Sequence, residues 1–422
     1  MRITAHKTSL LWLAGLFLLC AGSPLPAQAA ASDSLVRWQG EVQVSPARAL
    51  ATDEYVKRWL EKRRSLSLDA RLMHVTLPAD SDAFARDFGY PQMGVGLKLG
   101  LNDVTMHRSG DWGQAENVPY TSHLGNTITL YGLFQRPWLR LRHFSFDYSL
   151  AFGFTYCRKK YDKTDNIDDE LIGTHINIYC NLGTHATWYF APQWGLRAGV
   201  EFFHHSNGAL NRPNKGANFF GPVVGLAYEP QREVLLGARS RHLPAPFRPY
   251  WYLNFALGVG AKTLDEDWQK TQFNTPKDAP DYRTEHFRLY AAYALQADVM
   301  RRYARRWASG MGVDLFYGSH APHIRALDAA AGSRERVSPW SVGVAAKHEV
   351  YYHNLSLAMS FGLYLYRQMG VSAKALEQSY YERIGIHYAL PSLRGLTVGV
   401  NVKAHRTKAD FTEVVLALPV RL

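Results

Sequence analysis

The sequence predicts an all-β protein: a transmembrane antiparallel β-barrel of about 14 strands, within a range of about 12 to 16. Three observations lead to this fold class. Hydrophobic residues make up 47% of the chain although the mean hydropathy is only −0.24, so the apolar residues are dispersed. After the N-terminal region, no apolar run reaches the roughly 18 residues that a membrane-spanning helix needs. Apolar residues instead repeat at every second position over long stretches, as expected for strands with one apolar face.

Residues 1–29 have the features of a secretory signal peptide, with cleavage expected after Ala29. Two basic residues, an apolar core and a small-residue cleavage site follow one another: Arg2 and Lys7, then Leu10 to Leu19, then Ala27-Gln28-Ala29. The chain carries a formal net charge of +12, which favours anionic partners. Because an exported protein does not meet nucleic acid, we expect no nucleic-acid partner.

The segment that follows the signal peptide, 30–90, is predicted to be a periplasmic N-terminal segment. Within it, Asp53 to Arg64 reads as a basic helix and Leu66 to Leu77 as a further strand. The outer-membrane barrel itself is predicted over 91–422.

The clearest strand pattern runs from Phe144 to Tyr156. Its even positions are Phe, Tyr or Leu, and its odd positions are small or polar. Such runs extend over about 10 to 18 residues, whereas strands of soluble proteins average about 5 to 6 and tilted membrane strands need about 9 to 11. The pattern places strands near 91–102, 125–136, 143–157, 172–190, 193–206, 217–229, 249–264, 287–300, 306–317, 338–351, 355–366, 378–389, 394–404 and 411–422.

The connections between these strands alternate between short and long, as in outer-membrane barrels with short periplasmic turns and long external loops. One connection, 230–248, is long where a short turn is expected. It reads either as a periplasmic excursion or as a register error in the strand assignment.

Two cysteines, Cys157 and Cys180, follow the signal peptide. An exported chain permits a disulfide between them. Their positions in the alternating patterns place them on opposite faces of a sheet, so we expect two free thiols.

A polar pair interrupts the apolar stripe of the strand that ends at Ser206. Trp194, Leu196, Ala198, Val200 and Phe202 share one face, which then continues to His204 and Ser206. Polar groups on a lipid face are costly and are often functional. Residues two apart on a strand lie side by side, and a His beside a Ser can activate its hydroxyl as a nucleophile.

The next strand supplies a third polar residue, because Asn218 is the single polar member of its own apolar face. A hairpin turn centred near Asn211 brings Asn218 toward His204, where its side chain would orient the imidazole. Asn207, Gly208 and Ala209 follow the nucleophile directly and are candidates for oxyanion binding. The alternative is that His204, Ser206 and Asn218 are interfacial and turn residues without a catalytic role.

An acidic group lies in the predicted external loop and offers two interpretations. It is either a solvated loop or a calcium or lipopolysaccharide-bridging site. Its members are Asp162, Asp165, Asp168, Asp169 and Glu170.

One segment resembles the active-site segment of the lipid A 3-O-deacylase (PagL) family, or acyloxyacyl hydrolases. It reads His204-His205-Ser206-Asn207-Gly208-Ala209-Leu210, followed by Pro213-Asn214-Lys215-Gly216. The resemblance implies a lipid-facing Ser206 nucleophile and a His204 base. The family places Glu where this chain has Asn218, and an amide cannot offer a charge to the imidazolium. The close similarity covers about 15 residues, and the chain from about 249 onward is not accounted for by it.

These observations together predict an outer-membrane serine esterase that hydrolyses an acyl ester of lipid A. The expected location is the outer membrane of a Gram-negative bacterium, with the active site toward the outer leaflet. The expected partners are lipopolysaccharide and outer-membrane lipids, and the chemistry requires no cofactor and no metal. One alternative is an outer-membrane phospholipase A, which the string around Ser206 also resembles. The other is a non-catalytic porin or transporter, since about 14 strands leave room for a lumen. Neither the acyl position that is cleaved nor the oligomeric state follows from the sequence.

Overall fold

The structure is a computed structural model that describes residues 37–108, 120–238, 246–371, 378–406 and 408–422. The predicted signal peptide, 1–29, lies outside these residues. Among the helices of the described ranges, none has the length and apolar character needed to cross a membrane. The architecture is all-β, as predicted from the alternating patterns.

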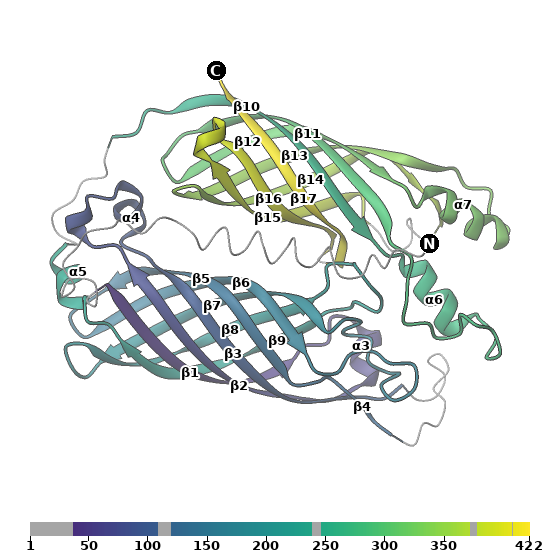
Figure 1. The fold of residues 1–422 in the computed structure, drawn as a ribbon, viewed down its shortest axis with the longest axis horizontal. Coiled ribbons are helices and arrows are strands. Elements are labelled where there is room, and N and C mark those ends of the chain that lie inside the picture. Colours follow the sequence, from purple (N-terminus) through teal and green to yellow (C-terminus); the bar gives the residue numbers. More distant parts are fainter. Residues whose placement is uncertain (1–36, 109–119, 239–245, 372–377, 407) are drawn as a thin grey trace.

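The first barrel closes with eight long antiparallel strands in an up-and-down order, β1 to β9 (Figure 1). Closure occurs because β1 pairs with β9 on one side and with β2 on the other, and β2 continues to β3. A two-residue strand, β4, adds to the end of β3. The bounds are β1 Trp38–Ala49, β2 Leu60–Val75, β3 Gln92–Met106, β4 Ser122–His123, β5 Thr127–Arg140, β6 Phe144–Cys157, β7 Ile176–Tyr189, β8 Trp194–Ser206 and β9 Ala217–Tyr228.

The second barrel also closes with eight antiparallel strands, β10 to β17, in which each strand pairs with its chain neighbours and β17 returns to β10. The bounds are β10 Tyr250–Lys262, β11 Tyr290–Arg302, β12 Trp307–Gly318, β13 Val337–Tyr352, β14 Leu355–Met369, β15 Tyr380–Leu390, β16 Leu396–His405 and β17 Lys408–Arg421. Short helices lie in the connections: α3 Glu54–Trp59, η1 Pro78–Asp80, α4 Ala83–Phe88, α5 Arg232–Ala238, α6 Asp265–Phe273, α7 Ala321–Ala330 and η2 Pro391–Leu393.

The prediction of one barrel over 91–422 is wrong, and so is that of a separate periplasmic segment over 30–90. Every predicted strand overlaps a strand of the structure, but β1 and β2 of that segment complete the first barrel. With these two strands, the chain forms two eight-stranded barrels instead of one of about 14 strands. The long connection 230–248 joins the two barrels, which explains why it is not a short turn.

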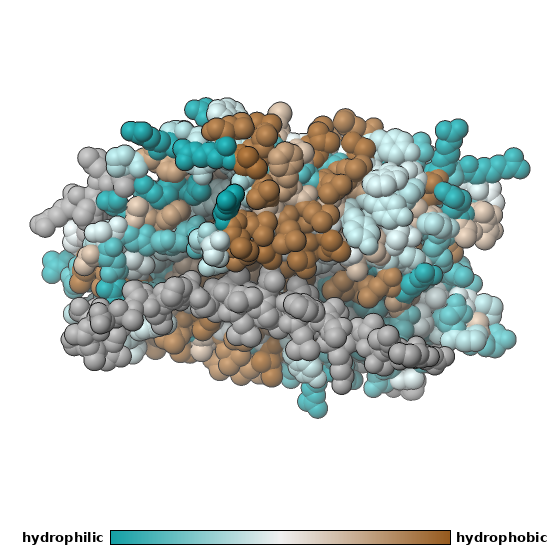
Figure 2. Space-filling view, turned by 45° about the horizontal axis from the view of Figure 1, so that its top comes forward, coloured by the Kyte–Doolittle hydropathy of each residue, from teal (hydrophilic) through white to brown (hydrophobic). Residues whose placement is uncertain are grey.

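Alternation along each strand separates an apolar outside from a polar inside. In β6, Phe144 and Phe146 point outward and are exposed, whereas the alternating residues Ser145 and Asp147 are buried. This is the reverse of a soluble β-sandwich and matches a barrel that faces lipid. Figure 2 shows apolar side chains gathered in the middle of one face between hydrophilic ends.

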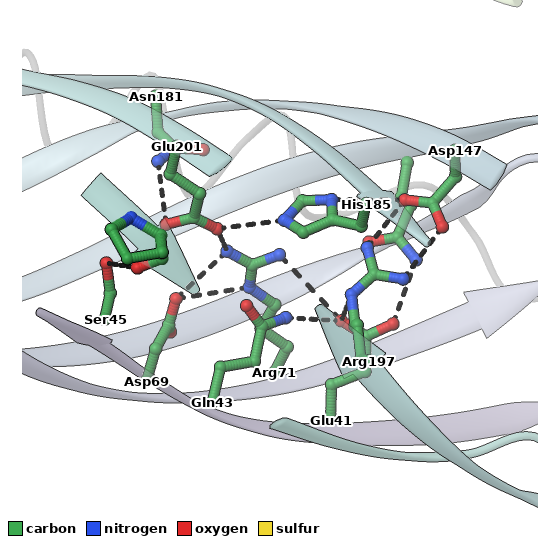
Figure 3. Close-up of polar contacts among 12 residues, drawn as sticks. Glu41, Gln43, Ser45, Asp69, Arg71, Asp147, Asn181, His185, Arg197 and Glu201 are labelled. Atoms are coloured by element: carbon green, nitrogen blue, oxygen red, sulfur yellow. Dashed lines mark hydrogen bonds and ion pairs between the residues drawn. The ribbon is translucent and has the colours of Figure 1, made fainter. Parts of the chain in front are cut away.

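The lumen of the first barrel is filled by buried charged side chains (Figure 3). Arg71 donates hydrogen bonds to Asp69 and, at 2.5 Å, to Glu201, which also accepts from Lys98 at 2.9 Å. Arg197 makes a bidentate pair with Asp147 at 2.6 and 2.8 Å. An eight-stranded barrel has an interior just wide enough for side chains, so these networks occupy it.

The second barrel has a comparable lumen network. Lys347 contacts Asp314 at 2.7 Å and Asp298 at 3.0 Å. Arg383 pairs with Glu413 at 3.1 Å, and Tyr381 donates a hydrogen bond to Asp314 at 2.7 Å. Both lumens are therefore polar and filled, which differs from the open lumen considered for a single barrel of about 14 strands.

The two barrels lie side by side and contact each other at both ends (Figure 1). At one end, α4 packs its Phe88 ring 5.6 Å from the Tyr352 ring, and Asp87 pairs with Arg305 at 2.9 Å. At the other end, the loop after β6 meets the segment after β10, where Lys160 pairs with Glu285 at 2.8 Å. These contacts join the connecting segments of the two barrels at both ends.

We predict that Arg197→Met destabilises the first barrel by about 3–5 kcal/mol, because removing one partner leaves the buried Asp147 carboxylate uncompensated. Chemical unfolding of the protein refolded in detergent, followed by tryptophan fluorescence, measures this. Arg301→Met, at the exposed end of β11, is the control, with a change within about 0.5 kcal/mol. Adding Asp147→Leu to Arg197→Met should recover stability. Equal stability of Arg197→Met and wild type would contradict the role assigned to the lumen network.

Candidate active site

His204, Ser206 and Asn218 form a continuous hydrogen-bonded chain. His204 and Ser206 lie at the end of β8, and Asn218 lies at the start of β9. The His204 Nε2 atom is 2.8 Å from the Ser206 hydroxyl oxygen, and its Nδ1 atom is 2.8 Å from the Asn218 side-chain oxygen. Antiparallel pairing places His204 directly opposite Asn218.

The three side chains lie on the outer wall of the barrel. On β8, Arg197 and Glu201 point into the lumen, as does His205, whose Nδ1 atom is 2.9 Å from the Thr155 hydroxyl. The alternation therefore turns His204 outward, on the side of Phe202 and away from the charged lumen. Ser206 is only 8% exposed, so the hydroxyl is sheltered although it is on the outside.

The hydrogen bonds of Asn218 define the state of the imidazole. The Asn218 side-chain nitrogen donates to the Gly216 carbonyl at 3.3 Å, which leaves its oxygen to accept from His204 Nδ1. With the proton on Nδ1, the Nε2 atom is a free acceptor for the Ser206 hydroxyl proton. This is the tautomer that a general base requires.

Gly216 permits the close approach of the imidazole. Its φ is +78°, and a Cβ atom at this position would lie 2.5 Å from His204 Cε1. A larger residue would displace the ring from Ser206. The Pro-Asn-Lys-Gly turn of the sequence thus ends on a residue that the site needs to be glycine.

The loop after Ser206 leaves two backbone N–H groups without acceptors. The Asn207 side-chain nitrogen donates to the Asn211 carbonyl at 3.1 Å, and the Asn207 N–H donates to the Asn214 side chain at 2.9 Å. The backbone N–H of Asn207 and one of the two N–H groups of its side-chain amide are therefore engaged within the loop. In the part of the chain that the structure describes, no group accepts from the N–H of Gly208 or of Ala209. Within the described ranges, those two backbone groups are free to donate to a ligand, as is the second N–H of the Asn207 amide.

The acidic loop after β6 packs beside the site and contacts the turn that leads to Gly216. Asp168 and Glu170 pair with Arg108 at 2.8 and 3.0 Å, and the Glu170 carbonyl accepts from the Lys215 N–H at 3.2 Å. Burial raises the pKa of Asp169 to about 8. The group is thus built into ion pairs and turns. Among the described residues, no set of three or more His, Cys, Asp or Glu side chains is arranged to hold a metal ion.

The two cysteines are free thiols, as predicted, and the structure adds site residues that the sequence did not indicate. Cys157 is buried and Cys180 is on the outer side of β7, opposite His204, and neither forms a disulfide. Asn214 was not singled out as a site residue, although its position in the turn after Ser206 was a usable signal. The contacts from the second barrel to Gly208 and Ala209 were not predicted either, because no local sequence pattern indicates them.

The closed barrels, apolar outer stripes and filled polar lumens define an outer-membrane type of β-barrel protein. Its outer wall carries a Ser-His-Asn arrangement typical of hydrolases. A family profile described as lipid A 3-O-deacylase (PagL) matches residues 90–227, and a second, described as acyloxyacyl hydrolase, C-terminal domain, matches residues 251–419. Together the two profiles cover most of the chain, which belongs to the lipid A 3-O-deacylase (PagL) family.

Comparison with solved structures gives weak overall similarity. A crystal structure titled as the outer membrane enzyme PagL is 12% identical, covering 43% of this chain and 97% of that chain with a TM-score of 0.26. A mutant of the Rh. blastica porin is 9% identical, with coverage of 90% and 99% and a TM-score of 0.16. The Pseudomonas putida toluene transporter TodX is 7% identical, with coverage of 91% and 88% and a TM-score of 0.18. A search of curated proteins found no match.

Proposed function

We propose that this protein is an outer-membrane serine esterase that hydrolyses an acyl ester of lipid A with the triad Ser206, His204 and Asn218. The observation that carries the proposal is the chain of two 2.8 Å hydrogen bonds on the outer wall of the first barrel. A hydroxyl at this position meets substrates that reside in the membrane, which is where the acyl chains of lipid A lie.

The mechanism follows from the positions of the atoms. Ser206 Oγ attacks the ester carbonyl while His204 Nε2 takes its proton, and the bond between the acyl carbon and the ester oxygen breaks as the imidazolium returns that proton to the leaving alkoxide. Asn218 holds the Nδ1–H of His204 during both transfers. Water then attacks the acyl-Ser206 ester with His204 again as base, releasing the fatty acid and restoring the serine.

The oxyanion of each tetrahedral intermediate is assigned to the N–H groups of Gly208 and Ala209. They lie two and three positions after the nucleophile and have no acceptor among the described residues. Removing one such donor costs about 10²–10³ in rate in serine hydrolases. The active site is proposed to face the outer leaflet, since its end of the barrel carries the long loops.

A phospholipase A is the second candidate, because a Ser-His-Asn triad with a neutral third member also suits ester hydrolysis of glycerophospholipids. Both candidates use the same three side chains and differ in the head group that is bound. Fatty-acid release from purified phospholipid, but not from lipid A, would select the phospholipase. A porin is disfavoured, since eight strands and a charged interior leave little room for a channel.

The decisive experiment is mass spectrometry of lipid A from cells that express wild type, Ser206→Ala or His204→Ala. We expect loss of one acyl chain with wild type and an intact acyl pattern with either variant. Heat-dependent electrophoretic mobility checks that each variant folds, and Cys180→Ala, next to His204 on the outer wall, is the matched control that should retain activity. An identical acyl pattern in all strains would exclude the deacylase.

A separate prediction follows from Asn218, the uncharged third member of the proposed triad. Asn218→Asp should raise kcat for ester hydrolysis by about tenfold or more, because a carboxylate stabilises the imidazolium that Asn218 can only orient. Asn218→Ala should lower kcat by a similar factor, since the His204 ring loses its hydrogen bond. Steady-state kinetics on a soluble ester measures both. If Asn218→Ala keeps the wild-type kcat, Asn218 is not part of the catalytic machinery.

A further inference from the structure

Thr412 of the second barrel lies on an outward stripe that is otherwise apolar. Val414, Leu416 and Leu418 share its face of β17 and are 41%, 46% and 45% exposed. Thr412 is only 6% exposed. It is covered because the loop after Ser206 of the first barrel packs against it.

The contact between Thr412 and this loop is made of directed hydrogen bonds. The Thr412 hydroxyl donates to the Gly208 carbonyl at 2.9 Å. Thr263, just after β10, donates its N–H and its hydroxyl to the Ala209 carbonyl at 2.8 and 2.9 Å. In return, Arg212 donates to the Thr263 carbonyl at 3.0 Å. The second barrel therefore holds two consecutive carbonyl groups of the catalytic loop.

Holding the Gly208 carbonyl also aims one N–H group of the loop. Each carbonyl shares a rigid planar peptide with the next N–H, so fixing the Gly208 carbonyl fixes the direction of the Ala209 N–H. Gly208 and Ala209 have φ values of +62° and +70°, in the left-handed region. For Ala209 this conformation is unfavourable and persists only where the surroundings impose it. A Cβ atom on Gly208 would lie 2.1 Å from the Thr412 hydroxyl oxygen, so the fit is tight.

We propose that the second barrel is a positioning element of the catalytic centre. Thr412 and Thr263 hold the Gly208–Ala209 backbone so that the free Ala209 N–H faces the oxyanion. This inference rests on the proposed esterase function and assigns a task to the C-terminal barrel in the same reaction. Thr412 and Thr263 are positioning residues, because they act through the loop and do not touch the reacting atoms.

The test compares Thr412→Val, which keeps the shape and removes the hydroxyl, with Thr412→Ser, which restores the donor. Using the full chain in detergent and a soluble p-nitrophenyl ester, we expect Thr412→Val to lower kcat by about 10- to 100-fold with KM nearly unchanged. Reaction of Ser206 with an alkyl phosphonate, whose adduct carries an oxyanion, should slow by a similar factor. Thr412→Ser should recover most of both rates.

A purely structural contact predicts a different pattern. In that case Thr412→Val lowers the unfolding temperature but leaves kcat and the phosphonate rate per folded molecule at wild-type values, and the proposal is wrong. Heat-dependent mobility counts the folded fraction. Failure of the esterase proposal is recognised separately, because wild type would then show no hydrolysis that depends on Ser206.

An independent observation concerns Arg48 of β1 and Arg64 of β2. The two residues are direct cross-strand partners, and both side chains point outward and are exposed. The Leu50 N–H donates to the Asn218 carbonyl at 2.8 Å, so Arg48 lies about 7–8 Å diagonally from Asn218 on the same face. Like charges that are directly opposite repel each other. In the described ranges neither guanidinium pairs with a carboxylate.

We infer that Arg48 and Arg64 bind a phosphate group of the lipid substrate while its acyl ester sits at Ser206. Guanidinium groups bind phosphate oxygens through paired hydrogen bonds, and a bound phosphate would relieve the repulsion between the two arginines. Asp103 lies opposite Arg64 but is engaged by Lys62 at 3.4 Å. This inference also rests on the proposed function and specifies an anionic head group for the substrate.

The kinetics of Arg48→Gln and Arg64→Gln test it, with purified lipid A and its enzymatically dephosphorylated form as substrates in neutral detergent. We expect KM to rise about tenfold or more for the phosphorylated substrate only, while the rate on the p-nitrophenyl ester stays unchanged. Arg301→Gln, near the end of β11 in the second barrel, is the control. A change that is equal for both substrates overturns the inference. So does a loss seen only when phosphatidylglycerol is added, which would assign the pair to a neighbouring lipid.

Discussion

Closure of each sheet at eight strands is the constraint on which the rest of this structure depends. A strand in lipid has no water to satisfy its backbone, so every N–H and carbonyl must pair with a neighbouring strand until the sheet meets itself. Eight strands leave an interior that side chains alone fill. The inward positions therefore carry ion pairs such as Arg197 with Asp147 and Lys347 with Asp314, which occupy the interior.

A filled lumen moves the chemistry to the outer wall. On a stripe that faces lipid, a polar side chain is stable only when it has a partner, and His204, Ser206 and Asn218 provide partners for one another. The same reasoning applies to Thr412 on the second barrel, which is polar, outward and hydrogen-bonded to the catalytic loop. In both barrels, these polar residues, which interrupt an outward apolar stripe, therefore belong to the proposed active centre or contact its loop.

The second barrel gives the catalytic loop a rigid support that an isolated barrel lacks. Loops are the mobile parts of outer-membrane barrels, whereas oxyanion donors must be held within a fraction of an ångström of their positions. Thr412 lies in β17 and Thr263 directly follows β10, so these two residues supply fixed donors to the carbonyls of Gly208 and Ala209. The family profile for this barrel and the profile for the first barrel therefore describe two parts of one proposed active centre.

Most strands were predictable from sequence because alternation is a local property, but β1 was not, and β2 was predicted only in part, as a strand over Leu66 to Leu77. β1 contains Pro46 and the outward Arg48, which break its apolar stripe, and β2 begins with the charged run Glu61 to Arg64, which reads as a basic helix. Without these two strands, the remaining ones add up to a single barrel. The number of strands in a closed barrel cannot be predicted from the periodicity of any one strand, because it depends on which two edge strands pair.

The sequence by itself determined which side chains share a face, and this was enough to place His204 beside Ser206 on the lipid side, since neighbours two apart on a strand are set by the pleat alone. Only the tertiary structure decided the division into two barrels and the arrival of Thr412 at Gly208 from 204 positions away. The physical reason is that these contacts depend on sheet closure and on packing between barrels, to which residues distant in the chain contribute jointly.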